Sequence, residues 1–246
     1  MDKSINNNYS FYEDIETNFK QAYDLCQKDF SHMEILDLLK NGNIPQKQIA
    51  ALKFDYINNI DDAKALLENL TGCDGKIREA VALKINSLLL SDEKSRKIFA
   101  DISAEKFADA TIDINANICR LVVDSAIMLK DFNNFSVKYT ECILQHTKDA
   151  LNEIDKFIFR DKKYVINKQI FKLYWCLEAL SDFFEYSDSN TLSDIIVKCA
   201  SQSEYTIREK IAKIIQKTNK FESIKEKLAN DENYYVREML HHPSFF

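Results

Sequence analysis

The residues best suited to binding chemistry lie between Asp155 and Trp175. Six basic side chains are interleaved there with six aromatic ones, and only Asp155 and Asp161 oppose their charge. Cationic side chains hold phosphates and aromatic rings stack on bases, so this mixture is what single-stranded nucleic acid or a flipped base requires. The twelve residues are Lys156, Phe157, Phe159, Arg160, Lys162, Lys163, Tyr164, Lys168, Phe171, Lys172, Tyr174 and Trp175.

One helical face of this segment combines basic, aromatic and acidic side chains. At about 100° per residue, the face opposite the apolar stripe that begins at Ile166 carries Lys168, Phe171, Lys172, Trp175 and Asp182. Two interpretations of this face are open. It presents a ligand-binding surface, or Phe171 and Trp175 pack under a neighbouring helix while the lysine stems extend past them to solvent.

The sequence shows no metal-binding or catalytic motif. Its three glycines cannot form a GxGxxG or Walker loop, and it contains neither HExxH nor CxxC. Cys142 and His146 lie one helical turn apart and His241 and His242 are adjacent, but two ligands do not make a zinc site. We therefore expect no metal, no cofactor and no catalytic residue.

Composition and capping patterns predict a chain made of helices. The 246 residues include 3 glycines and 2 prolines, too few for the turns of a β-sandwich, a barrel or a doubly wound α/β fold. Capping boxes at Ser10–Glu13 and Ser31–Glu34, a first-turn proline at Pro45 and the acidic pair at Asp61 mark helix starts. No segment alternates apolar and polar residues for long enough to predict a strand. The fold class we expect is all-α, with roughly a dozen helices.

Several of the expected helices open in the same way. Acidic residues stand three to five positions before a β-branched anchor, which is followed by arginine and glutamate. The three copies of this motif contain Asp74, Ile77 and Arg78, then Ile207 and Arg208, then Val236 and Arg237. Two weaker copies, anchored at Ile118 and Ile166, have Cys119 and Asn167 where arginine is expected. Behind the first four anchors apolar residues recur at helical spacing, as helices stacked in repeats require.

The motif resembles that of the HEAT-like repeat proteins, whose second helix opens with an acidic residue a few positions before Val-Arg. The resemblance covers about residues 44–246. It implies a right-handed α-solenoid, a superhelix of antiparallel helix pairs in which the Asp and Arg positions tie adjacent repeats together. Cys119 and Asn167 would interrupt that ladder. The domains we expect are a disordered segment over 1–8, a capping helical hairpin over 9–42, and HEAT-like repeats over 43–246 as a single continuous domain.

A candidate binding row follows from the same repeats. Positions two and six after each anchor point away from the buried stripe. They are Glu79 and Leu83, Arg120 and Asp124, Lys168 and Lys172, and Glu209 and Lys213. The row is mixed in sign, which suits either a polar protein surface or a solvated face. With Trp175, its charged members are our candidate partner-binding residues.

The leading hypothesis is a non-catalytic scaffold or adaptor that binds a protein or peptide partner on its curved face. The alternative is a nucleic-acid-binding or DNA-repair protein, because the lysine–aromatic–carboxylate face is similar to that of HEAT-like glycosylases that remove alkylated bases. A lyase or other small-ligand protein is a third reading, since related solenoids hold ligands in their groove. A net charge of −6 disfavours a surface that binds nucleic acid throughout.

The expected location is the cytoplasm. No apolar run approaches the roughly 20 residues of a membrane span, and the first eight residues are polar. The six cysteines lie far apart and mostly in apolar helical segments. Buried free thiols suit a reducing compartment.

Overall fold

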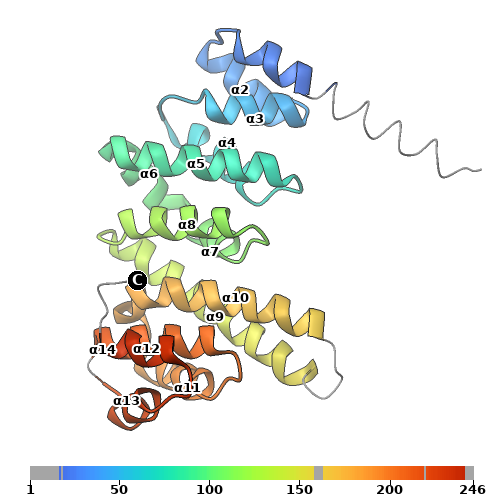
Figure 1. Ribbon diagram of the computed structural model, residues 1–246. Coiled ribbons are helices and arrows are strands. Elements are labelled where there is room, and N and C mark those ends of the chain that lie inside the picture. The colour runs from blue at the N-terminus through green and yellow to red at the C-terminus, as the bar shows by residue number, and fades with distance from the viewer. Residues whose placement is uncertain (1–16, 18, 158–162, 219, 242–246) are drawn as a thin grey trace, which may run out of the picture. The chain divides into compact units, whose positions relative to one another are not determined.

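The computed structural model describes residues 17, 19–157, 163–218 and 220–241. Within these residues every regular element is a helix and no strand occurs (Figure 1), which confirms the all-α prediction. Contacts group the chain into two compact units, Met1–Ile102 and Ser103–Phe246. Their boundary falls inside the segment 43–246 for which the sequence predicts one continuous domain. The predicted disordered segment 1–8 and the capping box at Ser10–Glu13 lie outside the described residues.

The first unit packs its helices around α5. After helical residues at 19–26, its helices are α2 (His32–Asn41), α3 (Ile44–Leu52), α4 (Ile60–Leu70), α5 (Gly75–Ser91) and α6 (Glu93–Ile102). Helix α5 contacts α3, α4 and α6, while α2 contacts α3 and α4. The predicted starts are confirmed at Ser31, which forms a capping box with Glu34, and at Asn43, which does so with Gln46 ahead of α3 and its early Pro45.

The second unit is built from successive helix pairs. Its helices are α7 (Ala104–Thr111), α8 (Ala116–Met128), α9 (Asn133–Phe157), α10 (Lys163–Phe183), α11 (Ser189–Cys199), α12 (Tyr205–Thr218), α13 (Glu222–Ala229) and α14 (Tyr234–His241), with the short 3-10 helix η2 (Phe184–Tyr186) after α10. Each of α8, α10, α12 and α14 contacts the helix that precedes it. These four also contact one another in chain order, α8 with α10, α10 with α12, and α12 with α14. Figure 1 shows α10 beside α12.

An aromatic cluster forms the centre of the second unit. Tyr139 is fully buried, with its ring 5.5 Å from Phe135 and 5.0 Å from Phe183. Its hydroxyl lies 2.8 Å from the Thr111 hydroxyl, so this buried polar group has a partner, as buried polar groups need. Burial raises the pKa of Tyr139, and the phenol stays neutral. The cluster joins α7, α9 and α10.

The repeated apolar anchors occupy equivalent places in their helices. Ile77, Ile118, Ile207 and Val236 are each the third residue of α5, α8, α12 and α14, and each is buried. Ile166 is the fourth residue of α10 and is half-buried. The anchors therefore lie in the first turn of α5, α8, α10, α12 and α14, so each motif opens a helix, as the sequence predicts.

The residue after four of the five anchors bonds to the loop before its helix. Arg78 Nη1 donates to the carbonyls of Gly72 (2.8 Å) and Cys73 (3.0 Å), which stand six and five positions earlier. Arg208 Nη1 does the same to Gln202 and Ser203, both at 2.8 Å, and Arg237 Nη1 donates to the carbonyl of Asp231. These donors satisfy loop carbonyls that the helices leave without partners.

Cys119 takes the place of arginine in the copy anchored at Ile118 and makes the equivalent contact. Its Sγ donates to the carbonyl of Asp113, six positions earlier, at 3.1 Å. The sequence interpretation treats Cys119 as an interruption of the motif. The structure shows that a buried thiol keeps the six-residue contact, although a thiol is a weak donor and serves one carbonyl rather than two.

Arg208 also links two successive helix pairs. Its Nε and Nη2 donate to the two oxygens of Asp231, at 2.7 and 2.9 Å. Asp231 precedes α14, and its Oδ1 also accepts from the backbone N–H of Asn233. The hydrogen bonds from Arg208 hold the pKa of Asp231 below its ordinary value. This bidentate pair joins α12 to the loop that precedes α14.

We expect Asp231→Asn to lower the free energy of unfolding by about 1–3 kcal/mol at pH 7, because Arg208 loses its charged partner. A depressed pKa contributes stability above the unfolded value of about 3.9 and loses it as pH falls through the folded value. The difference between the two proteins, measured by urea denaturation, should therefore vanish at low pH. Glu232→Gln is the control, since Glu232 is exposed and 3.6 Å from Arg208. A loss from Asp231→Asn that persists at low pH would contradict the pairing.

We expect Gly42→Ala to be costly and Gly72→Ala to be tolerated. A Cβ at Gly42 would lie 2.4 Å from the carbonyl oxygen of Leu38, which accepts the Gly42 N–H at the end of α2. At Gly72 the nearest atom would be 3.6 Å away. The expected loss in unfolding free energy is about 1–3 kcal/mol for the first variant and within about 0.5 kcal/mol for the second. Thermal denaturation of both variants tests this, and equal melting temperatures would contradict it.

Candidate functional site

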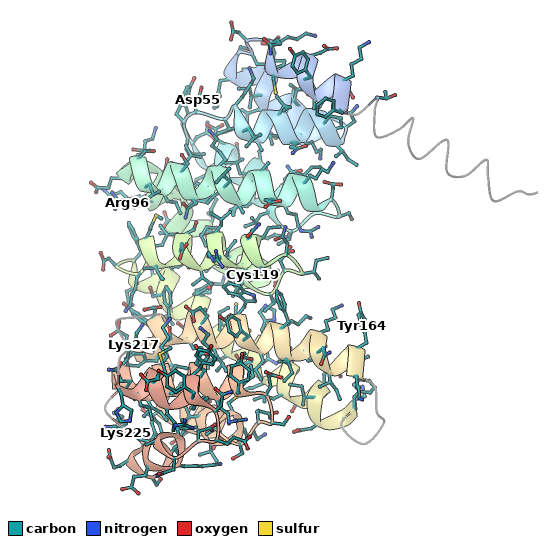
Figure 2. The ribbon with its side chains drawn as sticks, viewed as in Figure 1. Asp55, Arg96, Cys119, Tyr164, Lys217 and Lys225 are labelled. Carbon is teal, nitrogen blue, oxygen red and sulfur yellow. The ribbon has the colours of Figure 1, made fainter. Side chains whose placement is uncertain are left out.

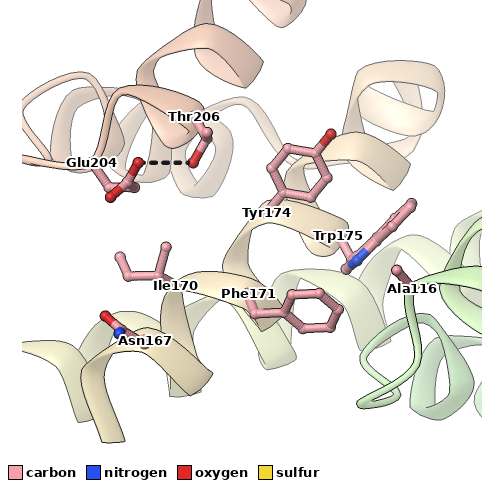
Figure 3. A pocket seen from close by; sticks show the side chains of 8 residues that line it. All are labelled: Ala116, Asn167, Ile170, Phe171, Tyr174, Trp175, Glu204 and Thr206. Carbon is pink, nitrogen blue, oxygen red and sulfur yellow. Dashed lines mark hydrogen bonds between the residues drawn. The ribbon is translucent and has the colours of Figure 1, made fainter. Parts of the chain in front are cut away.

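A pocket of about 480 Å³ lies in the second unit beside the first half of α10. Five of the lining residues belong to α10, and one is the first residue of α8. The other two are Glu204, which immediately precedes α12, and Thr206, the second residue of α12. The lining residues are Ala116, Asn167, Ile170, Phe171, Tyr174, Trp175, Glu204 and Thr206 (Figure 3). The volume is in the range of sites that hold small molecules or peptide side chains.

Three aromatic rings form adjoining walls of the pocket. The Trp175 ring lies 5.3 Å from Tyr174 at an interplanar angle of 85°, and 6.4 Å from Phe171 at 69°. These near-perpendicular pairs are favourable because the positive edge of one ring meets the negative face of the next. Trp175 is 7% exposed, and its Nε1 is buried with no hydrogen-bond partner in the described part of the chain. The pocket therefore meets the indole ring rather than its N–H.

The polar side of the pocket is made at the N-terminal end of α12. Figure 3 shows Glu204 and Thr206 on one side and the aromatic rings across from them. The Thr206 hydroxyl donates to Glu204 Oε1 at 3.5 Å. Glu204 immediately precedes α12, and its carbonyl accepts the N–H of Ile207. Its side chain lines a largely apolar pocket.

A ladder of ion pairs holds α12 against α10 beneath this pocket. Lys210 Nζ lies 4.5 Å from the centroid of the Tyr174 ring and 2.9 Å from Glu178 Oε2. Lys213 donates to the other oxygen of Glu178 at 2.7 Å, and Lys217 to Asp182 at 2.5 Å. The acceptors Tyr174, Glu178 and Asp182 are spaced by four along α10, and the lysines by three and four along α12, so the two rows lie on facing sides.

Burial and pairing act in opposite directions on the charges of this ladder. Burial lowers the pKa of Lys210, but the Glu178 carboxylate more than offsets that effect, and the pKa of Lys210 lies above its ordinary value. Burial likewise raises the pKa of Glu178, while Lys210 and Lys213 together bring that pKa below its ordinary value. Both groups therefore stay charged. Burial raises the pKa of nearby Glu209.

The basic–aromatic face predicted on α10 is divided in the structure. Lys168 is exposed and Lys172 half-buried, whereas Trp175 is buried and lines the pocket. Asp182 accepts from Lys217 and so belongs to the ladder. Phe171 is half-buried in the pocket wall. Phe159, Arg160, Asp161 and Lys162 of the same segment lie outside the described residues.

Three members of the predicted mixed-charge row, Asp124, Glu209 and Lys213, interact with Glu178 in the second unit. On α8, the side chains of Arg120 and Asp124 are exposed over much of their surface. Asp124 is still partly buried, and this partial burial, together with the charge of Glu178, raises its pKa. On α12, Glu209 is half-buried and Lys213 pairs with Glu178. Glu79 is half-buried on α5 in the first unit. Sequence reasoning missed Glu178, Lys210 and Glu204, although the matched spacing of lysines on α12 and acceptors on α10 was visible.

Within the described part of the chain, no group of three or more His, Cys, Asp or Glu side chains is placed to hold a metal ion. His146 Nε2 lies 3.2 Å from Asp109 Oδ1, so this histidine has an acidic partner on α7. Burial raises the pKa of Cys142, its neighbour one turn earlier.

Among the same described residues, no helix is both long and apolar enough to cross a membrane.

Comparison of the chain with protein-family models, with curated protein sequences and with solved structures finds no match. The resemblance to HEAT-like repeats therefore rests on the repeated motif of this chain.

We expect Glu178→Gln to lower the free energy of unfolding by about 2–4 kcal/mol, because it leaves Lys210 buried without its counter-charge. Asp182→Asn removes the same kind of charge from a more exposed pair and should cost less than about 1 kcal/mol. Urea denaturation of both variants at neutral pH measures the difference. Equal losses would show that the buried lysine does not depend on Glu178.

Proposed function

We propose that this chain is a HEAT-like helical-repeat scaffold that binds a protein or peptide partner through the pocket face of α8, α10 and α12. The repeated anchors, the six-residue loop contact after each of four anchors, and the successive helix pairs of the second unit support the repeat assignment. A right-handed superhelix remains the arrangement we predict from this resemblance. The role we propose is non-catalytic.

The pocket is the observation that carries the proposal. Its rings suit the insertion of a partner side chain, since aromatic residues dominate the energetics of protein interfaces. An aromatic surface adjoins it on the same unit. Tyr205, the first residue of α12, stacks at 6.2 Å on Tyr235 of α14, and Tyr234 and Tyr235 are exposed. The pocket and these tyrosines together offer an anchor site and a flanking surface.

The charges around the pocket support a polar macromolecular partner. Arg120 and Asp124 on α8 are exposed beside the paired Glu178 and Lys213. This mixture of positive and negative side chains is typical of the polar rim of a protein–protein interface. A surface that binds a polyanion such as nucleic acid would instead carry a continuous row of cationic side chains.

Nucleic-acid binding or DNA repair is the alternative, and one observation favours it. Lys163, Tyr164 and Lys168 are exposed at the start of α10, with Tyr164 82% accessible to solvent; Figure 2 shows Tyr164 at that end of the helix. Binding of this kind would weaken steeply with added salt. A small-molecule ligand is a third candidate, which the pocket volume favours.

We also propose that the protein acts in the cytoplasm. Each of its six cysteines is a free thiol in the structure. Burial raises the pKa of Cys119, Cys176 and Cys199 to about 12, so these thiols are protonated and unreactive at neutral pH. Buried free thiols suit a reducing compartment.

Affinity capture tests the proposed function with a variant that fills the pocket. Ala116 is exposed at the first position of α8 and lines the pocket, so Ala116→Leu should obstruct it without removing a contact. We expect tagged wild-type protein to recover a stoichiometric protein partner from host lysate after nuclease treatment, and Ala116→Leu to lose it at least tenfold. Asn190→Leu, exposed in the first turn of α11, is the matched control.

Two outcomes would contradict the scaffold proposal. Recovery of nucleic acid that disappears with nuclease would favour the alternative, and glycosylase assays on damaged DNA would follow. Recovery of neither a protein nor nucleic acid would favour a small ligand.

A further inference from the structure

The pocket walls are suited to a cation. Phe171, Tyr174 and Trp175 contribute aromatic rings to the pocket lining, and a cation beside an aromatic face is stabilised by the negative part of the ring quadrupole. The structure already contains one example, because the ammonium of Lys210 lies 4.5 Å from the centroid of the Tyr174 ring. The Trp175 ring meets the Phe171 ring at 69° and the Tyr174 ring at 85°, so neither of these rings lies flat on it.

The charge of the pocket points the same way. Among its described lining residues, Glu204 is the acidic one and none is basic. The lysines of the same helix are turned aside, since at about 100° per residue Lys168 and Lys172 lie roughly a quarter turn or more from the centre of the lining positions. A phosphate or carboxylate in the pocket would meet the Glu204 carboxylate, whereas a cation would be paired by it.

The polar groups of the pocket distinguish among cations. Glu204 can accept hydrogen bonds, and so can the side-chain oxygens of Asn167 and Thr206. The Trp175 N–H is buried, so it does not oppose them. A quaternary ammonium has no N–H to donate, and a lysine ammonium cannot lie flat on a ring. A guanidinium has five donors in a plane, stacks on aromatic faces and pairs with a carboxylate through two parallel bonds.

We propose that this pocket, which we name the guanidinium cage (Phe171, Tyr174, Trp175 and Glu204), binds an arginine side chain of the peptide partner. The inference rests on the proposed function and adds the residue type that the partner supplies. The guanidinium stacks between the aromatic walls and donates to Glu204. Residues flanking the arginine lie against Tyr205, Tyr234 and Tyr235, next to the cage mouth.

The chain carries its own reporter for this site. Trp175 is the single tryptophan of the sequence, and its ring lines the cage. Fluorescence of the full chain can be followed while N-acetyl-arginine amide is added. The comparison probe is N-acetyl-citrulline amide, which keeps the shape and replaces the guanidinium with a neutral urea. We expect a saturable change with the arginine probe and half-saturation at least tenfold higher for citrulline.

Removal of the cage carboxylate provides the second arm. We expect Glu204→Gln to raise half-saturation by the arginine probe about tenfold, as loss of a charge-assisted bond should. Glu226→Gln, an equal charge change at an exposed position of α13, should leave it unchanged. Equal responses to arginine and citrulline, or equal binding by wild type and Glu204→Gln, would overturn the proposal.

The two proposals fail in different ways. If Ala116→Leu abolishes capture of a protein but the arginine probe does not bind, the scaffold function stands and the cage assignment is wrong. If the arginine probe binds with the expected dependence on Glu204 but no protein is captured, the guanidinium cage is supported. The proposal that a protein or peptide partner supplies the arginine is then wrong.

Discussion

The ammonium of Lys210 is the charge on which the pocket region depends. The residue Lys210 is 7% exposed, and a buried ammonium is tolerated only where an opposite charge or hydrogen-bond acceptors pair with it. Glu178 provides the counter-charge and Tyr174 provides an aromatic face, both from α10. The pair thereby fixes how α12 lies on α10, and with it the position of Glu204 relative to the aromatic rings. A change in this packing would alter the pocket even where no lining residue changed.

The loops between helices depend on a second, simpler constraint. Their carbonyls precede the first residue of the helix's backbone hydrogen-bond ladder and are not part of it, so a side chain that reaches back provides their donor. Arginine does this at Arg78, Arg208 and Arg237, and the thiol of Cys119 does it in α8. Arg208 has donors to spare and extends to Asp231, which turns a loop contact into a link between helix pairs. Arginine therefore suits this position because it can serve two carbonyls and a carboxylate at once.

Helix positions were predictable because their causes are local. The capping oxygen of Ser31 and the proline at Pro45 act within a few residues, and so does the side chain of Asp74, which accepts from the N–H groups of Lys76 and Ile77. The apolar anchors were recognisable for the same reason, since helical spacing alone places a stripe on one face. The candidate site was only partly visible. Phe171 and Trp175 were singled out, but the lysines beside them pointed to an anionic ligand, and the carboxylate of the pocket comes from Glu204, about thirty residues away.

The sequence by itself determined the helical class, the starts of the helices and the recurring motif at the second helix of each pair. These features follow from interactions over one or two turns, which the order of residues specifies directly. The tertiary structure decided the division into two units, the burial of Trp175, the pairing of Lys210 with Glu178 and the assembly of the pocket from α8, α10 and α12. Such contacts join residues about thirty or more positions apart. These contacts depend on how each packed helix is rotated about its axis and how far it lies from its neighbours. Sequences with the same local pattern can differ in both of these quantities.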